Sequence, residues 1–297
     1  MPPAQIPFRN VLVIANPIAG RGRGASMAHE VERALRTCGA RCELHLTTGR
    51  GDARERASRL GPDVDLVVSI GGDGTLSEVL HGLPRHDMMV GVLPMGTANV
   101  LSLDLKLPRD VPGFMALCAS GRAQLVDTAS VNGDMLSFLV TGIGFDAAVV
   151  RAMERRRRGP ISKFDWVRAG LGTFFTWSAP RLELEVDGSR VPGDFGQVLV
   201  SNIVHYAGFD VLSPDRKLDD GLFEVYAFEG RSKARFLAHA LRGAISRFPS
   251  RSVSMRRGKH VVVRSDVPAP FQIDGDYCGE TPLELTVGSN PFRILVP

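Results

Sequence analysis

A block of three glycines and one aspartate stands between a predicted strand and a predicted helix. Residues 64–70 form an apolar, β-branched run typical of a strand buried on both faces, and residues 76–83 have helical spacing. A tight strand-to-helix turn lets a ligand approach bare backbone and presents N–H groups at a positive helix end, which favours a phosphate. The carboxylate of Asp73 would repel a phosphate unless it serves a metal ion or a hydrogen bond. The block consists of Gly71, Gly72, Asp73, Gly74 and Thr75. These residue types together indicate a functional site and not merely a tight turn.

Two further polar loops follow predicted strands in the same half of the chain. The strand at 11–15 leads into residues 16–24, and the strand at 90–93 leads into residues 96–99. Because the carboxyl ends of parallel strands meet at one edge of a sheet, we expect these loops to lie beside the glycine block. Their backbone N–H, hydroxyl, amide and guanidinium groups suit a polyphosphate. Together with Thr75 of the glycine block, the side chains concerned are Asn16, Arg21, Arg23 and Thr97.

Two short acidic segments stand in the C-terminal half. Asp274 and Asp276 follow an apolar run and are separated by one glycine. The pair suits a hairpin turn. It also suits a base, because a hydroxyl that attacks a phosphoryl group needs a carboxylate to orient it and accept its proton. The second segment, residues 217–223, suits either a polar turn before a strand or a Mg²⁺ site with oxygen ligands.

The pattern of elements changes once, near residue 125. Before it, strands alternate with helices, which predicts a doubly wound parallel α/β sheet with its ligands at the carboxyl ends of the strands. After it, short strands with hairpin turns predict an antiparallel β-sandwich-like domain. We therefore expect a nucleotide-binding domain at 1–125 and a β-rich substrate domain at 126–297, with the last strand able to return to the first domain.

The expected elements can be placed by residue number. The first domain has strands at 11–15, 42–46, 64–70 and 90–93 and helices at 27–38 and 53–60. The second domain has hairpin turns at Asn132-Gly133 and Asp187-Gly188 and helices at 161–176 and 232–247. Its further strands are expected at 197–204, 222–228, 260–264, 271–274, 283–287 and 292–296.

Composition sets broad limits on the class of protein. The 297 residues are 44% hydrophobic and 23% charged, as in a globular protein, and the formal net charge of +4 permits an anionic partner without naming one. Four irregularly spaced cysteines do not form a disulfide framework and suit a reducing cytoplasm. The first residues lack the features of a signal peptide, and no uncharged run approaches the ~20 apolar residues of a spanning helix. We expect a cytoplasmic protein with no nucleic-acid partner.

A basic run precedes an aromatic-rich helix. Residues 155–158 are four arginines, and the helix expected at 161–176 contains Trp166, Phe174 and Phe175. A basic, amphipathic segment of this kind is typical of a membrane-surface element, although a solvated basic face with a core helix behind it has the same sequence pattern. The pattern predicts peripheral contact with the anionic inner surface of the membrane.

The loops and acidic segments together resemble the diacylglycerol kinase catalytic family. The matching motifs are Asn16-Pro17 with Gly20, the block at 71–75, and Pro94 through Asn99, in the family's order and at approximately its spacing. More narrowly, the chain resembles bacterial lipid kinases related to sphingosine and ceramide kinases, over nearly its whole length. The resemblance implies ATP binding in a cleft between the two domains, dependence on Mg²⁺, and phosphorylation of a lipid hydroxyl.

The resemblance also implies roles for individual residues. Asp276 matches the family's proton acceptor by position, and Asp274 is the other candidate for the base. Asp220 and the carbonyl groups of Lys217 and Leu222 match a segment that holds Mg²⁺. The residues implied to contact the nucleotide are Asn16, Thr47, Gly71, Gly72, Asp73, Gly74, Thr75 and Thr97.

Several functions stay open at this point. Diacylglycerol, a sphingoid base and phosphatidylglycerol all present a hydroxyl beside apolar chains, so the sequence does not choose among them. An NAD-dependent oxidoreductase is an alternative because residues 20–25 satisfy G-x-G-x-x-A after a strand. A non-catalytic nucleotide- or lipid-binding module would keep the glycine loops but would need no base. The oligomeric state is also open, with a homodimer among the alternatives.

Overall fold

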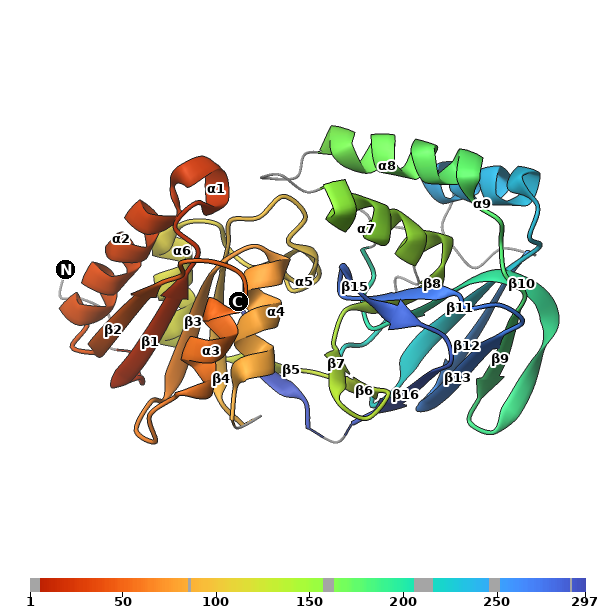
Figure 1. The fold of residues 1–297 in the computed structure, drawn as a ribbon. Coiled ribbons are helices and arrows are strands. Elements are labelled where there is room, and N and C mark those ends of the chain that lie inside the picture. Colours follow the sequence, from red (N-terminus) through yellow and green to blue (C-terminus); the bar gives the residue numbers. More distant parts are fainter. Residues whose placement is uncertain (1–5, 85–86, 157–162, 206–215, 246–251, 289) are drawn as a thin grey trace. The chain divides into compact units, whose positions relative to one another are not determined.

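The computed structural model of the protein divides into two compact units, each with its own sheet (Figure 1). Unit 1 contains Met1–Val126 and Asn290–Pro297, and unit 2 contains Asp127–Ser289. Within the described ranges, no helix is both long and apolar enough to cross a bilayer. The structure describes residues 6–84, 87–156, 163–205, 216–245, 252–288 and 290–297.

A six-stranded sheet forms the centre of unit 1, in the order β2-β1-β3-β4-β17-β5. All of these strands run parallel except β5, which is antiparallel to β17. Because the order reverses between β1 and β3, the loops after these two strands flank the switch point at which doubly wound sheets bind ligands. The strands are β1 (Asn10–Ala15), β2 (Arg41–Leu46), β3 (Leu66–Gly71), β4 (Met89–Pro94), β5 (Ala123–Val126) and β17 (Phe292–Leu295).

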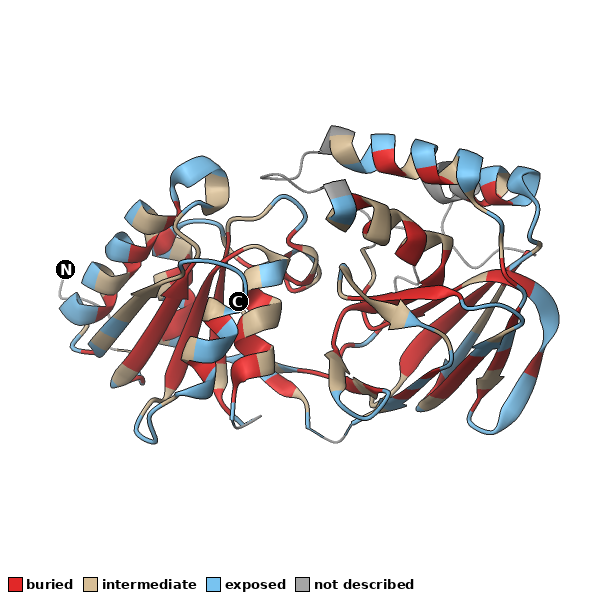
Figure 2. Cartoon of the chain, in the orientation of Figure 1, coloured by how far each residue is buried: buried red, intermediate tan, exposed pale blue. Residues whose placement is uncertain are grey.

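Helices connect the strands of unit 1 and cover its sheet. They are α1 (Ala19–Gly22), α2 (Gly24–Thr37), α3 (Asp52–Ser58), α4 (Asp73–Gly82), α5 (Val100–Asp104) and α6 (Val111–Ser120). Helix α2 packs against α6, and α3 lies beside α4 (Figure 1). Strand β3 is buried along its whole length, and the central strands of the sheet are largely buried in Figure 2. This burial accounts for the nearly continuous apolar sequence before the glycine block.

Unit 2 is built on an antiparallel sheet with strand order β15-β14-β8-β10-β9-β13-β16-β6-β7, to which β11 adds beside β10 and β12 beside β11. Its described helices are α7 (Phe145–Arg156), α8 (Lys163–Thr176) and α9 (Lys233–Ile245). The strands are β6 (Ala129–Val131), β7 (Met135–Ser137), β8 (Val140–Gly144), β9 (Leu182–Val186), β10 (Ser189–Ser201), β11 (Phe223–Glu229), β12 (Val253–Gly258), β13 (His260–Ser265), β14 (Pro270–Ile273), β15 (Asp276–Glu280) and β16 (Leu283–Val287).

The long strand β10 organises the core of unit 2. Its first part pairs with β9, and its last part pairs with β8 on one side and β11 on the other, with a register shift near Phe195. A bulge of this kind bends a strand, so that its two parts can pair with different neighbouring strands. Phe195, Phe223 and Phe271 are almost completely buried in one apolar cluster beneath these strands.

The observed architecture confirms the expected fold class, a parallel α/β unit followed by an antiparallel β unit. Both predicted hairpin turns form, with positive φ at Asn132, Gly133, Asp187 and Gly188. The sequence did not predict α7 or β12. Strand β12 is polar at Ser254, Arg256 and Arg257, so it lacks the continuous apolar signal of its neighbours.

Candidate functional site

Backbone hydrogen bonds bring the polar loops of unit 1 to one edge of its sheet. The N–H of Asn16 donates to the carbonyl of Ile70 at 2.9 Å, and the N–H of Thr47 donates to the carbonyl of Ala15 at 2.9 Å. The N–H of Gly20 donates to the carbonyl of Met95 at 3.0 Å. The loops after β1, β2, β3 and β4 therefore meet at the carboxyl ends of their strands. We call this edge the glycine rim, defined by residues 16–24, 47–51, 71–75 and 96–99.

Two glycines allow the central loops of the rim to touch backbone to backbone. A Cβ atom added at Gly96 would lie 2.5 Å from Cα of Gly72, and one added at Gly72 would lie 3.0 Å from Cα of Gly96. No side chain fits at the first of these distances. Glycine is therefore required by close approach, as expected where backbone N–H groups must line a ligand site.

The aspartate of the glycine block is used in a hydrogen bond within the rim. Its Oδ1 accepts from the backbone N–H of Val100 at 2.8 Å. Burial raises the pKa of the Asp73 carboxyl, against the opposing effect of the N–H groups of Val100 and Asn99. The sequence suggested that this carboxylate serves either a metal ion or a hydrogen bond. In the structure it accepts a hydrogen bond from the protein backbone.

Asn99 completes this connection and was not singled out by the sequence. It is buried, it has a φ of +51°, and its Oδ1 accepts from the N–H of Gly96 at 2.8 Å while its Nδ2 donates to the carbonyl of Gly96 at 2.7 Å. Asparagine tolerates a left-handed backbone because its short side chain bonds locally. The closed turn holds the loop in place and leaves Thr97 exposed.

The start of α4 supplies the donors that a phosphate needs. The first regular helical bond runs from the N–H of Leu76 to the carbonyl of Gly72, so Gly74 and Thr75 have no acceptor within the helix for their N–H groups. The helix contains 10 residues, enough for a positive end. Two arginines were expected near these donors. Arg23 donates from Nε to the carbonyl of Gly20 at 3.2 Å, and the side chain of Arg21 is exposed.

In unit 2, Asp274 is committed to the backbone. It lies in the β14–β15 turn with a φ of +52°. Its carboxylate accepts from the N–H groups of Phe138, Leu139 and Val140 at 3.1, 3.0 and 2.9 Å, and its own N–H donates to the carbonyl of Val140 at 2.8 Å. A carboxylate held by three N–H groups fixes the turn, so Asp274 has a structural role in the hairpin.

Asp276 stands at the other end of the same turn and is partly exposed. The turn is held from the side by Gln272, whose Oε1 accepts from the N–H of Gly275 at 2.7 Å and whose Nε2 donates to Asp146 at 2.8 Å. The two predicted acids therefore differ in environment. Three backbone N–H groups hold the carboxylate of Asp274, whereas Asp276 is the first residue of β15, and both residues are partly exposed.

The residues expected to hold Mg²⁺ do not fit a metal ion. Oδ1 of Asp220 accepts from Nη1 of Arg216 at 2.8 Å, and the carbonyl of Leu222 accepts from Nη2 of the same arginine. Lys217 lies on the surface of this turn. Elsewhere in the described part of the chain, no three His, Cys, Asp or Glu side chains gather closely enough to hold a metal ion. No catalytic step is therefore assigned to a metal at this turn.

Three of the four cysteines are poor nucleophiles. Burial raises the pKa of Cys42 and Cys278 to about 11 and that of Cys118 to about 12, so these thiols stay protonated at neutral pH. All four cysteines are free.

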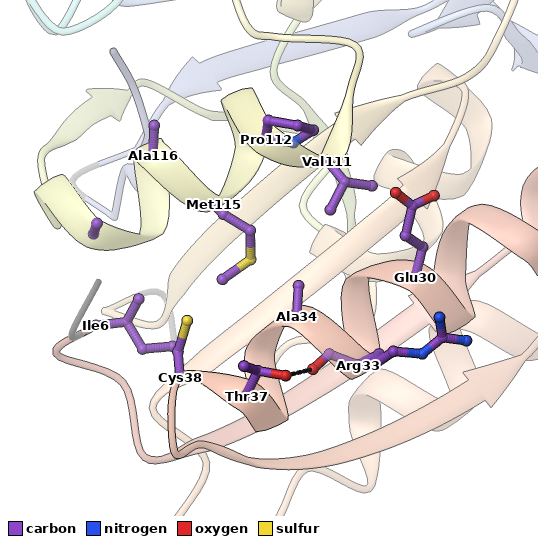
Figure 3. Close-up of a pocket in the computed structure, with 11 residues that line it drawn as sticks. Ile6, Glu30, Arg33, Ala34, Thr37, Cys38, Val111, Pro112, Met115 and Ala116 are labelled. Atoms are coloured by element: carbon purple, nitrogen blue, oxygen red, sulfur yellow. Dashed lines mark hydrogen bonds between the residues drawn. The ribbon is translucent and has the colours of Figure 1, made fainter. Parts of the chain in front are cut away.

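A cavity of about 540 Å³ lies between α2 and α6 in unit 1 (Figure 3). Met115 and Ala116 of α6, Ala34 of α2 and Cys38, which directly follows α2, are among the residues that line it. No residue of the glycine rim lines this cavity, so it is separate from the phosphate donors described above.

Each of the two units matches a protein-family model. A model described as the diacylglycerol kinase catalytic domain matches residues 10–131. A second, described as the YegS C-terminal NAD kinase beta sandwich-like domain, matches residues 140–296, more than half of the chain. The first match contains the whole glycine rim, and the second contains Asp220, Asp274 and Asp276.

Similar proteins span the same length. The chain is 28% identical to a diacylglycerol kinase of Staphylococcus carnosus (strain TM300) over 91% of this chain and 89% of the relative. It is 26% identical to one of Bacillus subtilis (strain 168) over 98% and 97%. A crystal structure of a Bacillus anthracis protein shares the fold, with a TM-score of 0.79 at 21% identity over 99% of both chains. The expectations of this family and of an enzyme are thereby confirmed. The chain belongs to the diacylglycerol kinase catalytic family and carries a YegS-type C-terminal domain.

Proposed function

We propose that the protein is an ATP-dependent lipid kinase that phosphorylates the hydroxyl of diacylglycerol or a closely related lipid. The observation that carries the proposal is the glycine rim, in which Gly72 and Gly96 meet backbone to backbone beside the start of α4, where the N–H groups of Gly74 and Thr75 have no acceptor within the helix. Family membership supports the lipid as acceptor.

In this proposal unit 1 binds the phosphoryl donor. The triphosphate of ATP lies against the N–H groups of Gly74 and Thr75, and Asp73 keeps the two central loops together through Val100. The remaining contacts come from the side chains of Asn16, Thr47 and Thr97 at the same rim. Mg²⁺ enters as part of the substrate, bound to the phosphates of ATP.

Unit 2 supplies the base. The lipid hydroxyl forms a bond to the γ-phosphorus while the bond between that phosphorus and the β–γ bridging oxygen breaks, and ADP leaves with the electron pair. The carboxylate of Asp276 accepts the proton of the hydroxyl. Asp274 holds the turn that carries Asp276, because its own oxygens are occupied by three backbone N–H groups.

The lipid substrate places the enzyme at a membrane surface, and α8 offers a contact for it. Val167, Leu171 and Phe175 follow one another at intervals of four residues and are all exposed, Phe175 to 71%. Arg168 is exposed on the same helix, and Lys233 of α9 donates to the carbonyl of Phe175. An apolar stripe flanked by cations suits an anionic leaflet. We therefore propose a cytoplasmic enzyme in peripheral contact with the inner membrane surface.

Part of the predicted membrane segment is outside the described residues. Arg157 and Arg158 belong to that part, so the proposal rests on α8 and α9 and not on the arginine run. The oligomeric state, which the sequence left open, is not part of the proposal.

One assay tests the function and separates its alternatives. Purified protein is incubated with γ-labelled ATP and mixed micelles that contain diacylglycerol, phosphatidylglycerol or a sphingoid base in turn. We expect label in the product of diacylglycerol, with little or none in the other two. If only another lipid is labelled, that lipid and not diacylglycerol is the acceptor. If the protein binds ATP but labels no lipid, a nucleotide-binding module is favoured over a kinase.

A further inference from the structure

A buried arginine lies in the turn for which the family resemblance implies a magnesium ion. Arg216 is only 7% exposed, and its side chain is fully covered. A guanidinium keeps its charge at every relevant pH, so a buried one requires acceptors around it. The acceptors that meet this requirement include the expected metal ligands.

The guanidinium bonds to three acceptors at once. Nη1 donates to Oδ1 of Asp220 at 2.8 Å, and Nη2 donates both to the carbonyl of Leu222 and to Oδ1 of Asn202. Asp220 and Leu222 are two of the three ligands that the resemblance implies. A Mg²⁺ ion draws its oxygen ligands to about 2.0–2.1 Å, and its positive charge would be repelled by the guanidinium that these oxygens already contact. Arginine and metal ion compete for the same oxygens.

The arginine also supports the turn that carries the proposed base. Its partner Asn202 donates from the backbone N–H to the carbonyl of Leu139 at 2.8 Å and from Nδ2 to the carbonyl of Asp127 at 3.0 Å. The backbone of Leu139 in turn donates to Asp274 at 3.0 Å. A chain of direct bonds therefore runs from Arg216 through Asn202 and Leu139 to the hairpin of Asp276.

We propose that the guanidinium of Arg216 takes the place, in this chain, of the divalent cation that the resemblance implies at Asp220 and Leu222. Unit 2 then folds around an internal cation and binds no resident metal ion at this turn. Given the proposed function, on which this statement rests, the only Mg²⁺ required for catalysis is the ion that arrives with ATP.

Binding of Mn²⁺ to the wild-type protein, followed by electron paramagnetic resonance without nucleotide or lipid, tests the proposal directly. We expect no saturable binding at Mn²⁺ concentrations up to about 1 mM, and a melting temperature that EDTA does not lower. Saturable binding that is lost in Asp220→Asn would overturn the proposal. Because neither ATP nor lipid is present, the result does not depend on whether the protein is a lipid kinase.

Removal of the guanidinium gives the second test. Arg216→Ala leaves Asp220 and Leu222 without their partner, so we expect the melting temperature to fall by roughly 5–10 °C and to be partly restored by Mn²⁺ or Mg²⁺. The matched control is Arg190→Ala, which removes an exposed arginine paired with Glu183 at 3.3 Å and should show neither effect. A folded Arg216→Ala that gains no affinity for Mn²⁺ counts against the proposal. If this variant does not fold, the wild-type titration still decides.

Discussion

Oδ1 of Asp73 accepts a hydrogen bond from the backbone N–H of Val100 at 2.8 Å, and this bond ties the loop after β3 to the loop after β4. The contact between Gly72 and Gly96 lies beside it, so the two loops meet both through backbone and through a side chain. The carboxylate thus has a structural reason to stand among phosphate donors, since it holds the donors in place.

The first prediction separates the hydrogen bond of Asp73 from its charge. Asp73→Ala removes the acceptor, so we expect phosphoryl transfer to diacylglycerol to fall by about 100-fold or more, while circular dichroism shows a folded protein. Asp73→Asn keeps an oxygen for the N–H of Val100 and should lose about tenfold at most. Equal losses in the two variants would mean that the charge, and not the hydrogen bond, is needed.

A second prediction concerns the pH dependence of stability. Burial raises the pKa of Asp73, so ionisation of this group costs more in the folded than in the unfolded chain. The stability that the group contributes is complete below the ordinary carboxyl pKa of about 4, and it is lost as the pH rises through the raised value. The melting temperature of Asp73→Asn, relative to wild type, should therefore increase as the pH rises from about 4 through the raised pKa. A difference that stays constant or decreases over this range would contradict the raised pKa.

The sequence predicted the parts of the site that depend on neighbours along the chain. The glycine block follows a buried strand, and its place at the edge of the sheet follows from the alternation of strands and helices. Asn99 and Arg216 received no role from the sequence, because what sets them apart is the burial of a polar side chain, which the fold alone determines. A lone arginine four residues before Asp220 has the pattern of an ordinary surface pair, and only the fold shows that its side chain is covered.

The different hydrogen-bond environments of the two acids of the β14–β15 turn were also hidden in the sequence. Both flank Gly275, and each has the chemistry of a base. Their difference arises from the segment at 138–140, which is more than 130 residues away along the chain and turns three N–H groups toward Asp274. No local pattern contains that information.

The third prediction uses this difference. Asp276→Asn should lower kcat by about 10²–10⁴-fold with a melting temperature close to that of wild type, because it removes a proton acceptor from a partly exposed position. Asp274→Ala should instead lower stability, by about 1–3 kcal/mol for each N–H group that stays unpaired. Kinetic assays and thermal unfolding of both variants check the assignment. Full activity in Asp276→Asn would remove this residue from the mechanism.

The fourth prediction concerns the contact between the glycine loops. In Gly96→Ala the new methyl group would lie 2.5 Å from Cα of Gly72, so the loops must separate. We expect a loss of stability of about 1–3 kcal/mol and a higher KM for ATP. Gly61→Ala is the matched control in unit 1, because the new Cβ atom would lie 3.9 Å from Cγ2 of Val64, an ordinary contact. A variant at Gly96 as stable and active as this control would show that the close contact is dispensable.

The last prediction tests the membrane contact of α8. Replacement of Val167, Leu171 and Phe175 by serine should weaken sedimentation with anionic vesicles by about tenfold or more, because the apolar stripe supplies the buried area at the interface. Val267→Ser is the control, since this valine is equally an exposed apolar residue, 56% accessible, but lies in the turn between β13 and β14. Arg168→Ala should weaken binding mainly at low ionic strength, where charge attraction is least screened. With a water-dispersed short-chain diacylglycerol as substrate, the serine variant should keep the wild-type kcat, which separates docking from catalysis. Unchanged vesicle binding in that variant would exclude α8 as the docking surface.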